Sequence, residues 1–75
     1  MDSKEFLENF KNQFIDADEI TLELESDFRQ IGSWDSLTGM AIIAMIEDEY
    51  GKIVEDNEFK AAKTVKELFE LVQSK

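Results

Sequence analysis

Residues that interrupt helices are scarce in this chain. It contains no proline and only three glycines, Gly32, Gly39 and Gly51. Because glycine and proline are the residues that most disfavour helix interiors, long helices have room to form between these positions. The chain has 75 residues, which is enough for one domain and too few for a second core. We therefore expect a single domain over residues 1–75.

Apolar residues at helical spacing predict an all-α fold, a small four-helix bundle with three long helices, one short helix and a long first loop. A first helix is expected over residues 3–15, where Asp2 or Ser3 can cap the start. A second is expected over residues 36–50. It ends at Gly51, a natural position for a left-handed cap.

The rest of the bundle is predicted from shorter patterns. Residues 55–62 form one short helical turn that inserts Phe59, and residues 65–74 form the last long helix. Thr64 caps that helix, with Glu67 three residues later as in a capping box. Residues 16–35 alternate briefly like a strand, but a lone strand has no partner, so we expect a long loop pinned by its apolar residues. A loop of this length in a compact domain is often functional.

Two residue types that usually carry chemistry are missing, since the chain has no cysteine and no histidine. Their absence removes disulfides, thiolate metal sites and the usual general base. Asp16 and Asp18 start like a calcium-binding loop, but the glycine and the glutamate that such a loop requires do not follow. We expect a non-catalytic protein without a metal site.

The chain is strongly acidic, with 18 acidic residues, 8 basic residues and a formal net charge of −10. Such a surface repels nucleic acid and anionic membranes, so a partner that is met by electrostatics should be basic. No apolar run is long enough to span a membrane, and the first residues lack the features of a signal peptide. We therefore expect a cytoplasmic monomer.

The expected helix over residues 36–50 has apolar residues on two faces. The core-facing group contains Ile42, Ile43, Ile46 and Tyr50. The other group lies beside two acidic residues and contains Leu37, Met40, Ala41, Ala44 and Met45. An apolar patch with a charged rim is a candidate protein-binding surface. A helix buried on all sides is the alternative, which a bundle of this size makes less favourable.

The sequence Trp34-Asp35-Ser36-Leu37 stands at the start of this helix, directly after the long loop. Asp-Ser-Leu in this setting resembles the acyl carrier protein family, which includes the peptidyl and D-alanyl carriers. The likeness extends to residues 28–32 upstream, to residues 37–40 and 43–51 in and directly after the helix, and to residues 64–65 with the last helix. The tripeptide alone is a weak signal, and its place in the expected architecture makes it specific.

In that family the serine of the motif carries 4′-phosphopantetheine, whose thiol holds acyl groups as thioesters. The resemblance implies that Ser36 is the attachment residue and that Asp35 takes part in recognition by a phosphopantetheinyl transferase. A helix N-terminus also favours a phosphodiester anion. From the residues alone, Ser36 could equally be an ordinary helix cap, a role that Asp35 could also fill.

The resemblance further implies docking of acyl-transferring, condensing or ligating enzymes with basic patches. The positions that match the family's docking residues are Leu37, Met40, Ala44, Glu47 and Asp48. The expected function is a free-standing acyl carrier for fatty acid, polyketide or related specialised acyl biosynthesis, whose bundle can shelter the acyl chain. The alternatives are a peptidyl or D-alanyl-type carrier and a small acidic helical adaptor that binds a basic partner without a prosthetic group.

Overall fold

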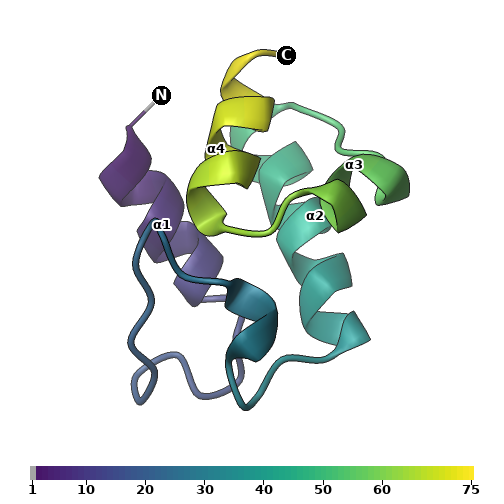
Figure 1. Cartoon of the computed structure of the whole chain (residues 1–75). Coiled ribbons are helices and arrows are strands. Elements are labelled where there is room, and N and C mark those ends of the chain that lie inside the picture. The colour runs from purple at the N-terminus through teal and green to yellow at the C-terminus, as the bar shows by residue number, and fades with distance from the viewer. Residues whose placement is uncertain (1) are drawn as a thin grey trace.

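Four helices make up most of the computed structural model, which describes residues 2–75: α1 (Ser3–Lys11), α2 (Ser36–Tyr50), α3 (Asp56–Ala61) and α4 (Val65–Gln73). A short 3-10 turn, η1 (Phe28–Gln30), lies in the loop between α1 and α2. Figure 1 shows the start of α1 and the C-terminus at one end of the bundle, and this loop with the start of α2 at the other. The predicted all-α bundle, with its short third helix and long first loop, is confirmed.

Helix α1 is shorter than predicted. The Asp2 side chain accepts a hydrogen bond from the Lys4 amide at 2.9 Å and caps the start as expected. The helix ends at Lys11 instead of residue 15, with Asn12 as its C-cap, and the chain continues in a tighter turn in which the Phe14 amide donates to the Lys11 carbonyl. Phe14 is still buried, so the last apolar residue of the pattern reaches the core from a turn.

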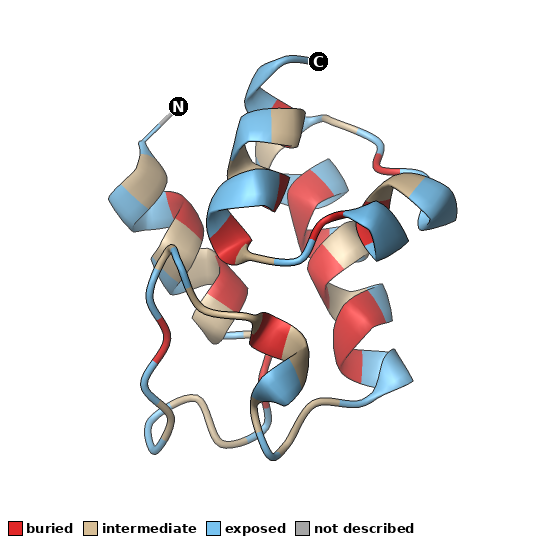
Figure 2. Ribbon diagram, in the orientation of Figure 1, coloured by how far each residue is buried: buried red, intermediate tan, exposed pale blue. Residues whose placement is uncertain are grey.

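Helix α2 begins and ends where the sequence predicts. Asp35 is its N-cap, and Gly51 is its C-cap in the left-handed conformation, with φ of 67°. Figure 2 shows buried residues along the side of α2 that faces the other helices and exposed ones on the outer side. The assignment of Met45 to the outer group was wrong, because this side chain is only 7% exposed and belongs to the core.

The core is built mainly from aromatic rings and branched aliphatic side chains. Its fully buried members come from every long helix and from η1: Phe6, Phe10, Phe28, Ile42, Ile46, Val65, Leu68 and Val72. Helix α1 packs against both α2 and α4. The Phe10 and Phe28 rings meet edge to face, with centroids 5.0 Å apart, so the long loop contributes directly to the core.

The long loop has no helix or strand over residues 20–26 and is held against the start of α4 by backbone hydrogen bonds. The Lys66 amide donates to the Leu24 carbonyl at 2.8 Å, and Asp27 forms an isolated bridge with Thr64. Leu22 is buried and Leu24 is half-buried against the core. The loop is therefore pinned by its apolar residues, as predicted.

The last two helices have side-chain caps. In α3, Glu55 and Glu58 form a reciprocal capping box, which the sequence analysis missed. In α4, the Thr64 hydroxyl accepts from the Glu67 amide at 3.1 Å, while the Glu67 carboxylate accepts from the Lys63 amide. Phe59, on α3, is buried in the core, as predicted. Within residues 2–75, the helices are all too short or too polar to cross a membrane.

Candidate functional site

The start of α2 is capped by Asp35. Its backbone is extended, with φ of −153° and ψ of 177°, and its carboxylate Oδ1 accepts from the Thr38 amide at 2.8 Å and the Thr38 hydroxyl at 3.0 Å. Such a cap satisfies one of the free amides that every helix start presents. Thr38 is buried, which fixes the position of the carboxylate over the first turn.

These contacts also set the charge of Asp35. The hydrogen bond from the Thr38 amide, followed by that from the Thr38 hydroxyl, lowers the pKa of the Asp35 carboxyl below its usual value of 3.8. Partial desolvation opposes the shift, and the Leu37 amide adds to it. Asp35 is therefore a carboxylate at neutral pH. Its negative charge interacts favourably with the positive end of the α2 dipole.

Ser36 is the first residue of α2 and is exposed. Because Asp35 is the N-cap, the alternative in which Ser36 serves as an ordinary helix cap is wrong. The hydroxyl is therefore not required for capping and stands at the surface beside an anchored carboxylate. An exposed serine hydroxyl at a helix start is accessible to an enzyme that modifies it, and nearby amides favour an added anion.

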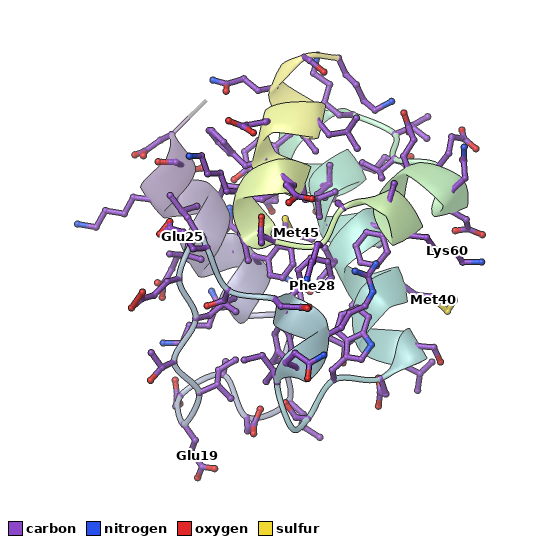
Figure 3. The ribbon with its side chains drawn as sticks, viewed as in Figure 1. Glu19, Glu25, Phe28, Met40, Met45 and Lys60 are labelled. Carbon is purple, nitrogen blue, oxygen red and sulfur yellow. The ribbon has the colours of Figure 1, made fainter. Side chains whose placement is uncertain are left out.

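The outer face of α2 continues from Ser36 along the helix. Leu37 is 71% exposed and Met40 is 65% exposed, although large apolar side chains are usually buried. Figure 3 shows Met40 pointing away from the bundle and Met45 inside it. The other predicted docking residues, Ala44, Glu47 and Asp48, are exposed on the same helix.

A shallow groove runs beside this outer face. It is lined by Gln13 from the end of the α1 region and by residues of α2: Ala41, Ala44, Met45, Glu47, Asp48 and Glu49. Its lining therefore combines apolar side chains with three acidic ones. The groove brings together three of the predicted docking residues, Ala44, Glu47 and Asp48, whereas Leu37 and Met40 lie outside its lining.

The loop just before Ser36 is held in place by a contact that sequence reasoning missed. The Ser33 hydroxyl donates to the Asp16 carboxylate at 2.6 Å, which ties the two ends of the long loop together. The neighbouring Ile15 is 93% exposed. No local pattern signals a bond between residues 17 positions apart, so only the fold could identify it.

An aromatic cluster beneath Ser36 was also missed. Trp34 stacks on Phe59 of α3, with centroids 6.1 Å apart and an interplanar angle of 20°, and meets Phe28 edge to face at 5.4 Å. The Arg29 guanidinium lies over the Phe28 ring, with its carbon 4.6 Å from the centroid. The apolar character of Trp34 and Phe59 was the only signal in the sequence.

Comparison with protein families places most of this chain in one of them. A family model described as the phosphopantetheine attachment site matches residues 12–72, which include the long loop and all of α2, α3 and nearly all of α4. A comparison with curated proteins finds no match.

Proposed function

The chain belongs to the phosphopantetheine attachment site family, and from this membership we propose that Ser36 holds a 4′-phosphopantetheine arm. Members of this family carry that group covalently on a serine. Three serines lie within the matched residues: Ser26, Ser33 and Ser36. The exposure and the hydrogen bonds of these three serines favour Ser36 as the attachment residue.

Two of these serines have structural roles. The Ser26 hydroxyl accepts from the Glu23 amide at 2.9 Å within a turn of the loop, and the Ser33 hydroxyl donates to Asp16. Ser36 is exposed, and the helix is capped by Asp35 and not by Ser36. The single observation that carries the proposal is this: Ser36 alone of the three is exposed at the start of a long helix.

The residues around Ser36 fit a phosphodiester. The first turn of α2 supplies backbone amides and the positive end of the helix dipole, although the Thr38 amide is already used by Asp35. The anion would therefore rely on the amides nearest to Ser36 itself. During attachment, the Ser36 oxygen forms the new bond to phosphorus, the phosphoanhydride bond of coenzyme A breaks, and the nucleotide part leaves. The hydroxyl proton passes to a base of the transferase.

The attached arm supplies a thiol, which this chain lacks, for carrying acyl groups as thioesters. We propose that residues 1–75 form one carrier domain. This domain catalyses no reaction of its own and presents substrates to other enzymes. Fatty acid, polyketide and related specialised acyl biosynthesis are the pathways that such a carrier would serve. Its partners would be a phosphopantetheinyl transferase and enzymes that transfer, condense or ligate acyl groups.

Docking of these enzymes is assigned to the outer face of α2. Leu37 and Met40 offer exposed apolar contacts close to Ser36, while Glu47 and Asp48 provide negative charge further along the helix. Asp35 adds a fixed carboxylate beside the reacting hydroxyl. Charge complementarity of this kind raises association rates more than affinity, which suits enzymes that must visit and leave repeatedly.

The test is the intact mass of the protein after incubation with coenzyme A and a broad-specificity phosphopantetheinyl transferase. The wild type should gain one phosphopantetheine, Ser36→Ala should gain none, and the matched control Ser33→Ala should gain one. A gain by Ser36→Ala equal to that of the wild type, or no gain by the wild type, would show that the proposed attachment site is wrong.

A further inference from the structure

The space directly beneath Ser36 on the inner side of α2 is at Gly39. Residues three apart on a helix lie on neighbouring parts of one face, so Gly39 is one turn below Ser36. Gly39 is buried. A flexible chain attached to Ser36 that turned into the bundle between α2 and α3 would meet this position first.

Aromatic rings already fill that position. A Cβ atom at residue 39 would lie 3.1 Å from Cη2 of Trp34 and 3.3 Å from Cε2 of Phe59, which is closer than ordinary van der Waals contact. The Trp34 ring also contacts Phe28 and Phe14, with centroid distances of 5.4 and 6.2 Å. The two rings therefore occupy the room that a missing side chain leaves, and the indole is packed on several sides.

Hydrogen bonds hold this arrangement closed. The Arg29 guanidinium donates to the carbonyls of Phe59 and Ala62, both at 2.7 Å, and so ties η1 to the end of α3. It also lies 5.1 Å from the Phe59 ring centroid and 5.7 Å from that of Trp34. A passage opened by moving α3 away from both α2 and η1 would break these charge-assisted hydrogen bonds as well as the ring stack.

We propose that this carrier keeps its cargo outside the helical bundle, because Trp34 and Phe59 close the way inward beneath Ser36. The cargo is then a short or polar acyl group, such as a small carboxylic acid or an aminoacyl group, since a long alkyl chain left in water gains nothing from burial. This inference rests on the proposed attachment at Ser36 and specifies the class of substrate. It runs against the expectation that the bundle shelters an acyl chain.

The experiment loads the wild type from acetyl-, hexanoyl- and decanoyl-coenzyme A with the same transferase and confirms each product by mass. The rate of thioester cleavage by hydroxylamine then reports how exposed the cargo is. We expect rates within about twofold across the three lengths and no rise in Tm with length, since a cargo that is not bound cannot stabilise the fold. A decanoyl thioester cleaved about tenfold more slowly than the acetyl one, or a Tm that rises with length, overturns the proposal.

Trp34→Leu tests the assigned barrier, with Ile53→Ala, at a side chain that is 61% exposed and outside the docking face of α2, as a surface control. The smaller side chain opens space beneath Ser36, so the decanoyl thioester should become several-fold slower to cleave than the acetyl thioester in this variant alone. Equal rates in a folded Trp34→Leu protein would show that Trp34 is not the barrier. A length effect in the wild type that Ala44→Glu removes would place the chain in the groove beside α2, which also contradicts the proposal.

The two proposals fail in different ways. If neither the wild type nor Trp34→Leu gains mass from any of the three acyl-coenzyme A donors, the proposed attachment at Ser36 is wrong and the inference about cargo is wrong as well. If the wild type loads and its cleavage rate depends on chain length, only the inference is wrong.

Discussion

The carboxylate of Asp35 accepts hydrogen bonds from both the amide and the hydroxyl of Thr38, at 2.8 and 3.0 Å. The residue before Ser36 therefore caps α2, and Ser36 itself is left with an unneeded hydroxyl at the surface. The helix cap and the proposed attachment residue are therefore two neighbouring residues, Asp35 and Ser36.

Acid should weaken the fold partly through Asp35. Its pKa is lowered in the folded state by the Thr38 hydrogen bonds, so its stabilising effect is present above the usual value of 3.8 and is lost as the pH falls through the folded pKa. We expect the free energy of unfolding to fall below about pH 4. Asp35→Asn keeps a good N-cap without a charge, so its urea midpoint should fall less steeply with acid.

Glu58 provides a check on this pH dependence. Its pKa is also lowered, first by the Glu55 amide and then by the Lys75 ammonium, so Glu58→Gln should remove a separate part of the acid sensitivity. The two effects should add, because the groups share no hydrogen-bond partner. An Asp35→Asn protein with the same acid profile as the wild type would contradict the role assigned to the carboxylate.

Adding one methyl group at Gly39 should destabilise the protein. The new Cβ would crowd Trp34 and Phe59, whose rings are packed too closely to move away freely. Overpacking of about 1–3 kcal/mol should exceed the roughly 1 kcal/mol that alanine gains over glycine in a helix. We expect a net loss of about 1 kcal/mol for Gly39→Ala in urea denaturation followed by Trp34 fluorescence.

Gly32→Ala is the matched control for that change. A Cβ at residue 32 meets nothing within 4 Å, and its backbone is not in the left-handed region. This substitution should leave stability within about 0.5 kcal/mol of the wild type. A Gly39→Ala protein that is more stable than the wild type would show that the rings beneath Ser36 yield easily.

Local signals explain what could be predicted of α2. The polar cap at Asp35 and the glycine at Gly51 act through neighbouring residues, so both helix ends follow from the sequence. The end of α1 did not, because Phe14 continues the apolar spacing while the backbone has already left the helix. Periodicity reports which residues are buried and does not by itself distinguish a helix from a turn that buries the same side chain.

The side of α2 that Met45 occupies depends on its neighbours in space. A helical wheel places it near the outer group, but Met45 is buried in the same core cluster as Leu22 and Phe28 of the long loop, and the wheel takes no account of such loop residues. The aromatic cluster of Trp34, Phe59 and Arg29 was likewise out of reach, since it joins the end of the long loop to α3, which lies on the far side of α2 in the sequence. Ser36 could be proposed from the sequence because its signal is a local motif.

Two methionines on α2 should respond differently to truncation. Met45 is 7% exposed, so Met45→Ala should cost about 2–4 kcal/mol of unfolding free energy through lost burial and a cavity. Met40 is 65% exposed, and Met40→Ala should change stability by less than about 0.5 kcal/mol. Urea denaturation measures both. Met40→Ala should instead raise the KM of the transferase for the carrier, if the outer face of α2 is the docking surface.

Arg29→Lys should weaken the junction between η1 and α3 although it keeps the charge. The guanidinium reaches the Phe59 and Ala62 carbonyls at the same time, and a lysine ammonium cannot reproduce this planar, two-pronged geometry. We expect a loss of about 1–2 kcal/mol in urea denaturation, within the range for hydrogen bonds to charged groups. Near-ultraviolet circular dichroism should change as well, because the stack of Trp34 on Phe59 loses its support.

Lys60→Ala provides the control for a change of charge near α3, since Lys60 is exposed on the same helix and points away from the bundle (Figure 3). Its effect on stability should be within about 0.5 kcal/mol. If Arg29→Lys is as stable as the wild type and keeps its aromatic signal, the two carbonyl contacts do not hold α3 in place. The barrier beneath Ser36 would then depend on the aromatic rings alone, and a decanoyl cargo should be cleaved by hydroxylamine at the same rate in both proteins.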